Sequence, residues 1–236
     1  MSMHLKILFI ITSHASLPSG KNTGYYLPEL AHPYHVLSKH YTIEFASPQG
    51  GRCPVDPGSV KDFANDEVCK KFMDNGQIQM ELEQTEKLEN IVNRAHEYAG
   101  VFFPGGHGPM FDLADNEHSH FIVRTVYEKG GIISAVCHGP AGIVRCKLSN
   151  GEYLIKDKRI TCFSNEEENL VELSSQMPFL LESKIKENGG RYEKASKPWG
   201  ECVVVDGRLV TGQNPASSLK LGEELHHVIQ ANLKEA

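Results

Sequence analysis

Short, mostly apolar runs recur along the chain and limit the folds that it can adopt. They span residues 5–12, 42–46, 101–103, 132–136 and 159–163. The first run lacks the alternation of apolar and polar residues that marks a half-exposed strand. Continuous runs of this kind are typical of strands in a parallel sheet that is covered on both faces. We therefore expect a central sheet that is shielded from solvent on both sides.

Stretches with helical spacing separate these runs. Two apolar helix faces are marked by Leu88, Ile91, Val92, Ala95 and Tyr98 and by Phe121, Ile122, Thr125 and Val126. Strands that alternate with helices are the signature of a parallel sheet with crossover helices. The predicted fold class is therefore α/β, with a doubly wound, mostly parallel sheet and helices on both faces.

The remaining segments complete one domain over residues 1–236. Residues 202–205 and 209–211 flank Asp206-Gly207 and predict a C-terminal hairpin with a type I′ turn, followed by a last helix over about 215–232. A further helix is expected over 174–188, closed by Gly189-Gly190. Residues 48–76 are rich in Gly, Pro and Asp and fit neither period. We interpret this region as a small lid, inserted at about 48–80 beside the edge of the sheet.

Composition excludes several classes of protein. The chain has 236 residues, and 24 Lys and Arg against 30 Asp and Glu give a formal charge of −6. Such a charge argues against a nucleic acid or an anionic membrane as partner. No run reaches the ~18 apolar residues of a membrane span, and the apolar stretch at 7–11 is shorter than the core of a signal peptide.

Six cysteines, at 53, 69, 137, 146, 162 and 202, include no C-x-x-C pair and no zinc-knuckle spacing. A chain of this length does not need disulfides to fold, so we expect a reducing, cytoplasmic location. Each cysteine is then either a small buried hydrophobe or a reactive thiol.

Cys137 differs from the other five because it follows a predicted strand directly. Ala135 stands two residues before it and Gly139 two residues after it, as a strained strand-to-helix turn requires. Pro140 suits the first turn of the next helix. A thiol at a helix N-terminus faces free backbone N–H groups that stabilise a thiolate. We therefore predict that Cys137 is a nucleophile of low pKa; the alternative, a buried structural cysteine, is preferred for the other five.

A glycine-rich loop, Pro104-Gly105-Gly106-His107-Gly108, follows another predicted strand. Ligands of open α/β sheets bind at the carboxyl ends of the strands. The loop's bare backbone N–H groups are suited to an oxyanion formed beside a thiolate. Alternatively, the loop is a tight turn or a phosphate cradle, although no P-loop or dinucleotide-binding motif is present.

Pro28 and Glu29 open the helix that follows the first strand. A glutamate in a first helical turn often does no more than complement the helix dipole. If Glu29 reaches the pocket, however, its carboxyl can hydrogen-bond the thiol, and burial would raise its pKa into the range of a proton carrier.

Together these residues resemble the DJ-1/PfpI superfamily, and most closely its Hsp31-like branch of glutathione-independent glyoxalases, which are also described as chaperones or deglycases. The resemblance rests on Thr23-Gly24, Pro28-Glu29, Ala31-His32-Pro33-Tyr34, Gly106-His107-Gly108, Ala135-Val136-Cys137-His138-Gly139-Pro140, Ile160-Thr161 and residues 206–217. It implies a flavodoxin-like sheet of the class I glutamine amidotransferase kind, no cofactor and a homodimer. The loop at Pro104-Gly105-Gly106 departs from the Ala-Ser-Ala type of fungal members and looks more like that of other branches.

The resemblance also implies the roles of individual residues. Cys137 matches the family nucleophile, His138 its adjacent histidine and Glu29 the carboxylate that contacts the thiol. Gly105, Gly106 and His107 match the loop that holds the oxyanion and the substrate. The acidic residue that orients the histidine is assigned to Glu168, with Glu166 and Glu167 as competitors. The implied reaction converts methylglyoxal, or another small 2-oxoaldehyde, to lactate through a hemithioacetal.

Other functions remain open on the sequence alone. A holdase chaperone for unfolded clients and a protein deglycase are the main alternatives. A cysteine peptidase or amidase ranks lower because the residue adjacent to the thiol, His138, is doubtful as an aligned base, and a redox sensor would use the same thiol. His32 with His35, and His118 with His120, have metal-ligand types but no nearby Asp or Cys partner, so we predict solvated histidines and no metal.

Overall fold

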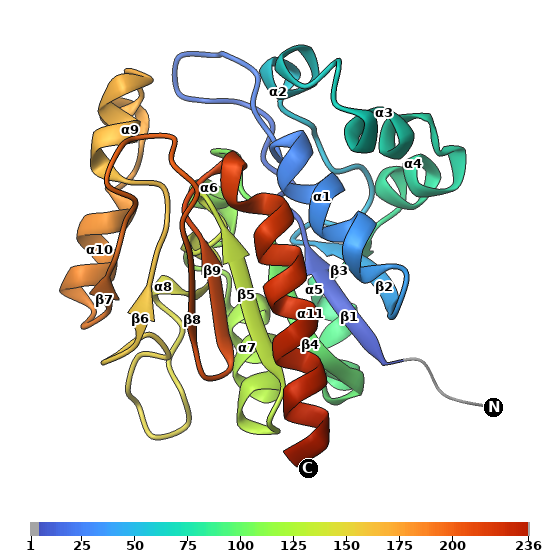
Figure 1. Ribbon diagram of the computed structural model, residues 1–236, viewed down its shortest axis with the longest axis vertical. Helices are drawn as coiled ribbons and strands as arrows, with labels where there is room; N and C mark the ends of the chain where they lie inside the picture. Colours follow the sequence, from blue (N-terminus) through green and yellow to red (C-terminus); the bar gives the residue numbers. More distant parts are fainter. Residues whose placement is uncertain (1–4, 236) are drawn as a thin grey trace.

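The computed structural model describes residues 5–235 and is built around a seven-stranded sheet (Figure 1). The strand order is β3-β2-β1-β4-β5-β9-β8, and every neighbouring pair is parallel except β8 with β9. The strands are β1 (Lys6–Ile10), β2 (Thr42–Ser47), β3 (Glu86–Lys87), β4 (Tyr98–Phe103), β5 (Ile132–Val136), β8 (Val203–Asp206) and β9 (Leu209–Gly212). The predicted doubly wound, mostly parallel sheet with a C-terminal hairpin is confirmed.

Helices cover both faces of the sheet. On one face lie α1 (Leu27–Leu37) and α11 (Ser218–Glu235), which cross in front of the strands in Figure 1; α5 (Leu88–Ile91) and α7 (Glu117–Glu128) cover the other. Alternate residues of β1 supply the two cores: Ile7 and Phe9 pack with α1 and α11, whereas Leu8 and Ile10 pack with α5 and α7. Because both faces are buried, the strand could not show a period of two.

Shorter elements connect this frame. They are α2 (Pro57–Asp62), α3 (Glu67–Asp74), α4 (Gly76–Glu83), α6 (Pro109–Asp112), α8 (Ala141–Val144), α9 (Asn165–Leu170), α10 (Leu181–Glu187), the strands β6 (Arg159–Ile160) and β7 (Arg191–Tyr192), and the 3₁₀ helices η1 (Val92–Glu97), η2 (Ser174–Gln176) and η3 (Pro215–Ser217).

The predicted lid region contains α2, α3 and α4, which lie beside α1 in Figure 1. Its interpretation as a stretch without a helical period was wrong. Each helix is at most eight residues long and begins at its own side-chain cap, namely Asp56, Asp66 and Asn75. The Asp and Asn residues that suggested irregular loops are therefore N-caps. That the segment acts as a lid stays a prediction.

The run at 159–163 is not a strand of the central sheet, contrary to expectation. Only β6 is extended there, and it pairs with β7 in a separate two-stranded sheet. The position beside β5 is taken by β9 instead. The chain after β6 runs across the ends of these strands, where the Thr161 N–H donates to the Thr211 hydroxyl and the Phe163 N–H to the Cys137 carbonyl.

Three local predictions also needed correction. The helix expected to reach Tyr98 ends its α part at Ile91, and Tyr98 opens β4. Pro178 interrupts the helix expected over 174–188, which leaves η2 and α10. In the hairpin, Asp206 pairs with Leu209, so Gly207 and Arg208 are the central residues. Of these two, Gly207 alone has a positive φ, which fits a type II′ turn rather than type I′.

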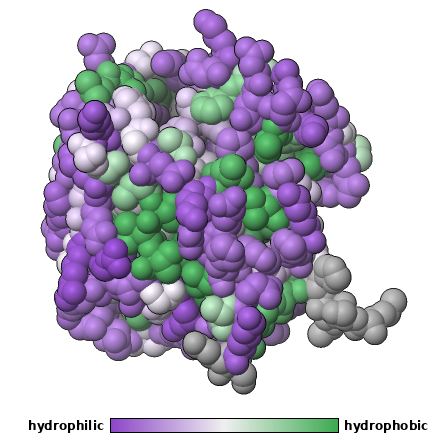
Figure 2. Space-filling model, in the orientation of Figure 1, coloured by the Kyte–Doolittle hydropathy of each residue, from purple (hydrophilic) through white to green (hydrophobic). Residues whose placement is uncertain are grey.

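Hydrophilic residues cover much of the face shown in Figure 2, and hydrophobic residues form patches between them. Across residues 5–235, no helix combines the length and the apolar character that crossing a membrane requires.

Candidate active site

The site lies where the winding of the sheet reverses. β2 adjoins β1 on one side and β4 adjoins it on the other, so the connections after β1 and β4 run in opposite directions. Ligands of open α/β sheets bind in the crevice that this reversal opens. Glu29 follows β1, the loop at 104–108 follows β4, and Cys137 follows β5. The three sequence signals therefore meet at one edge.

Cys137 stands at a strained elbow, as predicted from its small neighbours. Its φ is +58°, which is uncommon for a residue with a side chain. The backbone is pinned on both sides, because the Cys137 N–H donates to the Gly212 carbonyl at 3.0 Å and the Cys137 carbonyl accepts from the Phe163 N–H at 2.9 Å. A Cβ on Gly139 would lie 2.3 Å from the Phe103 carbonyl oxygen. The surrounding chain thus enforces the strain.

His138 bridges the thiol and a carboxylate through opposite nitrogens of its ring. The Cys137 Sγ lies 3.4 Å from Nδ1, and Glu168 Oε2 lies 2.5 Å from Nε2. The other oxygen of Glu168 lies 2.9 Å from His107 Nε2. A neutral His138 that donates its Nε2–H to Glu168 keeps Nδ1 free to accept the thiol proton. His138 is therefore aligned as a base toward the thiol, which the sequence alone left in doubt.

Three consecutive glutamates at the start of α9 separate into three environments. Glu168 lies against His138, whereas Glu166 pairs with Lys194 at the surface, 2.8 Å away. Glu167 is buried in a capping box with Ser164 and also accepts from Gln213, Asn214 and the Trp199 N–H. Successive residues point in different directions around a helix, so one of the three reaches the histidine.

Glu29 is completely buried beside the thiol. The loop after β4 passes so close that a Cβ on Gly105 would lie 2.4 Å from Glu29 Oε2 and 2.7 Å from the Cys137 Cβ. No residue with a side chain fits at position 105 without moving one of these two groups. The glycine that the sequence suggested for oxyanion binding therefore also makes room for the carboxyl and the thiol.

Burial sets the electrostatics of this pair. It raises the pKa of Glu29 to about 8, although the thiol and the backbone N–H groups of Gly105 and Gly106 oppose the shift. Neither carboxyl oxygen has a partner at hydrogen-bond geometry among the described residues. Burial, and then the charge of an ionised Glu29, raise the pKa of the Cys137 thiol well above its usual value.

The predicted low pKa of Cys137 is therefore wrong for the free protein. The expectation rested on the dipole of the following helix, but α8 has four residues, and the thiol is shielded from water. Glu168 behaves in the opposite way: burial would raise its pKa, but His138 and His107 hold it well below the usual range. At neutral pH the site thus holds one carboxylate, on Glu168, and one carboxylic acid, on Glu29.

Cys137, Glu29 and His138 line a small pocket of about 90 Å³, whereas Glu168 lies behind His138, outside its wall. This volume is below the ~300–1,000 Å³ of pockets that hold drug-sized ligands, so the pocket suits a small molecule. The sequence-predicted residues in its wall are Glu29, Gly106, His107, Cys137 and His138. The residues that sequence reasoning missed are Tyr26, Phe163, Val171, Trp199 and Pro215. Trp199 had one available signal, since it is the single tryptophan of the chain.

Two groups of side chains among residues 5–235 have the types and spacing of metal ligands. His107, His138 and Glu168 form one and are already hydrogen-bonded in this site; His32, Asp66 and Cys69 form the other. The expectation that His32 has no Asp or Cys partner was therefore wrong. Its partners, Asp66 and Cys69, lie 34 and 37 residues further along the chain. His35, His118 and His120 belong to neither group.

The fold and the site together define a flavodoxin-like α/β protein with a cysteine elbow at the topological switch point. The chain belongs to the DJ-1/PfpI family, whose model matches residues 23–227. Among its relatives, it is 33% identical to glyoxalase 3 of Candida albicans over 97% of this chain and 100% of that protein. It is 31% identical to the glutathione-independent glyoxalase HSP31 of Saccharomyces cerevisiae over 90% of this chain and 93% of that protein.

Solved structures agree with these matches. The crystal structure of glyoxalase III from Candida albicans superposes with a TM-score of 0.87 at 33% identity, covering 95% of this chain and 97% of that one. The Rapid Encystment Protein of 24 kDa from Francisella tularensis superposes with a TM-score of 0.90 at 35% identity, covering 95% and 99%. The predicted Hsp31-like resemblance is thus confirmed.

Proposed function

We propose that this protein is a glutathione-independent glyoxalase that converts methylglyoxal or a similar small 2-oxoaldehyde to the 2-hydroxy acid, lactate in the case of methylglyoxal. The observation that carries the proposal is the relay from Cys137 through His138 to Glu168, with the protonated carboxyl of Glu29 on the same small pocket. The similarity to proteins named glyoxalases, over nearly the full length of this chain, supports it.

The first step forms a carbon–sulfur bond. Cys137 Sγ attacks the aldehyde carbon while its proton passes to His138 Nδ1, 3.4 Å away. Glu29 gives its proton to the aldehyde oxygen, which the backbone N–H groups of Gly106 and His138 also hold. A carboxyl with a pKa of about 8 is well matched to proton transfer at neutral pH. The result is a hemithioacetal beside an ionised Glu29 and a charged His138.

The second step moves hydrogen between the two carbons. The Glu29 carboxylate takes the proton from the former aldehyde carbon while His138 protonates the neighbouring ketone oxygen, which gives an enediol. Glu29 then returns its proton to the second carbon, and the hydroxyl on the first carbon loses its proton to His138, which leaves a thioester. One carbon has been oxidised and the other reduced, so no external oxidant or reductant is required.

Hydrolysis completes the cycle. Water adds to the thioester carbon, its spare proton returns to Glu29, and the departing sulfur recovers a proton from His138. The net reaction adds one water to methylglyoxal. Throughout, Glu168 stays ionised and stabilises the charged form of His138, because its pKa lies well below the usual range.

Replacement of Cys137 tests the proposal. A Cys137→Ala protein should lose turnover of methylglyoxal, whereas Cys202→Ala, which changes a half-buried cysteine outside the pocket, should keep it. Conversion at the wild-type rate by Cys137→Ala would refute the assignment. The small pocket argues against the peptidase alternative, because a polypeptide needs an extended groove.

A chaperone role is the second candidate, and one observation favours it. Leu170, Val171 and Trp199 are 58%, 36% and 46% exposed, and the last two line the pocket. Exposed apolar side chains of this kind suit an unfolded client. Such a holdase function should survive in Cys137→Ala and weaken in Leu170→Ser with Trp199→Ser. A deglycase activity, a homodimer and a cytoplasmic location stay predictions.

A further inference from the structure

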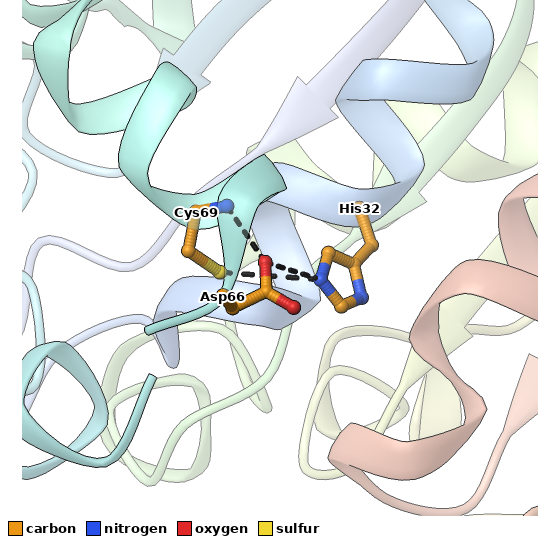
Figure 3. Close-up of side chains that lie close together, drawn as sticks. All are labelled: His32, Asp66 and Cys69. Carbon is orange, nitrogen blue, oxygen red and sulfur yellow. Dashed lines mark hydrogen bonds and ion pairs between the residues drawn. The ribbon is translucent and has the colours of Figure 1, made fainter. Parts of the chain in front are cut away.

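Three side chains with metal-binding chemistry meet outside the active site (Figure 3). His32 projects from α1, Asp66 is the N-cap of α3, and Cys69 lies in the first turn of α3. His32 Nε2 lies 3.1 Å from Asp66 Oδ1 and 4.0 Å from Cys69 Sγ. Cys69 is buried, whereas the side chains of His32 and Asp66 remain 14% and 30% exposed. The cluster therefore has a dry side and an accessible side.

The cluster does not have the geometry of a catalytic relay. In the active site, the thiol and the carboxylate approach opposite nitrogens of His138. In this cluster, the thiol and the carboxylate approach the same nitrogen, Nε2 of His32, as Figure 3 shows. One ring nitrogen cannot pass a proton between them, because it either donates or accepts. The arrangement instead brings three electron-pair donors, from sulfur, nitrogen and oxygen, around one point.

We propose that His32, Asp66 and Cys69 form a zinc site. Imidazole, carboxylate and thiolate are the protein ligands that Zn²⁺ uses, at ~2.0–2.3 Å from the ion. Tetrahedral coordination at those lengths separates the donor atoms by ~3.3–3.6 Å. The separations of 3.1 Å and 4.0 Å fall on either side of this range, so small side-chain movements place all three donors around an ion. The exposed side leaves the fourth position to water.

The charges of the cluster agree with a cation. A divalent cation would offset the charge of both the carboxylate and the thiolate. The ion would also join α1 to α3 at His32, one helical turn beyond Glu29. We infer that its role is to hold the predicted lid segment against the helix that carries Glu29.

Metal titration of the full-length protein tests the site. The protein is stripped with a chelator and titrated with Co²⁺ and with Zn²⁺, in a Cys137→Ala background that removes the active-site thiol. Thiolate-bound Co²⁺ is recognised by its charge-transfer absorption in the near ultraviolet, and calorimetry gives the Zn²⁺ stoichiometry. Asp66→Asn is an informative variant because Asn is as good an N-cap as Asp, so α3 is retained while the charged ligand is lost.

One Zn²⁺ per chain and a cobalt–thiolate band are expected in the Cys137→Ala protein. The band should disappear in Cys69→Ser, and Zn²⁺ affinity should fall at least about tenfold in His32→Gln and in Asp66→Asn. His35→Gln is the matched control, since His35 lies one turn further along α1 and contacts Lys39 instead. Unchanged affinity in Asp66→Asn, or a titration without any thiolate band, would overturn the proposal.

Discussion

Replacing Glu29 by Gln should change the stability of the protein by an amount that moves in favour of the variant as the pH rises. The pKa of Glu29 rises from 4.5 to about 8 on folding, so the folded chain keeps a proton that the unfolded chain releases. A raised pKa in the folded state contributes stability that is complete below pH 4.5 and is lost as the pH rises through 8. The amide introduced by Glu29→Gln does not titrate, so the variant escapes this loss.

The magnitude follows from the shift. Each pKa unit corresponds to ~1.4 kcal/mol. Between pH 4.5 and pH 7 the wild-type protein therefore loses about 3 kcal/mol of unfolding free energy through Glu29, and above pH 8 it has lost about 5 kcal/mol. The fixed effect of exchanging an oxygen for an amide group is the same at every pH. It therefore cancels when the difference in unfolding free energy between variant and wild type is compared at two pH values.

Urea denaturation of both proteins at about pH 5 and pH 7 measures this difference. The advantage of Glu29→Gln should grow by roughly 2–3 kcal/mol between these conditions. The same variant should lose turnover while its thiol stays open to alkylation, because an amide cannot carry the proton. A stability difference that does not change with pH would show that Glu29 is ionised in the folded protein, and would refute the proton transfers assigned to it.

Three further predictions address the other groups of the site. Alkylation of Cys137 by iodoacetamide should keep accelerating as the pH rises through and beyond the range in which an ordinary thiol ionises, since burial raises the pKa of this thiol. A rate that is already constant below pH 6 would contradict this. Glu168→Gln should lower kcat/KM by roughly 10²–10⁴-fold while KM changes little, because the charged form of His138 loses its carboxylate partner. Steady-state kinetics measure this; an unchanged kcat/KM would exclude the role of Glu168 in stabilising the charged His138. Gly105→Ala should lower the free energy of unfolding by ~1–3 kcal/mol and abolish turnover, because the new Cβ would lie 2.4 Å from Glu29 Oε2. Gly76→Ala is the control: a Cβ there meets nothing within 4 Å, so turnover should not change. Thermal unfolding and activity measurements compare the two variants.

The fold could be predicted because burial on both faces leaves a direct trace in the sequence. A run such as the one containing Ile7, Leu8, Phe9 and Ile10 is apolar throughout, since its alternate residues enter two different cores. No comparable trace marks α2, α3 and α4, which have six to eight residues and are defined mainly by their caps. Residues 159–163 show that the same trace can also mislead. This run is buried across the ends of the strands without joining the central sheet.

The site divides in the same way. The elbow at Cys137 is a local feature, so its small neighbours already indicate the turn that the structure contains. The direction in which the thiol pKa shifts depends on burial by distant segments, including those that supply Phe163 and Trp199. The spacing of nearby residues does not reveal that burial. The partners of His32 are equally remote, since Asp66 and Cys69 approach it through tertiary packing alone.

The central claim is that a cysteine of this protein performs an internal oxidation and reduction on a 2-oxoaldehyde without glutathione. The most direct test measures lactate and the remaining methylglyoxal together, with purified protein and no added thiol. The mechanism predicts one lactate for each methylglyoxal consumed, over many turnovers of each chain. Loss of methylglyoxal without lactate, with the aldehyde recovered as adducts on the protein, would contradict it.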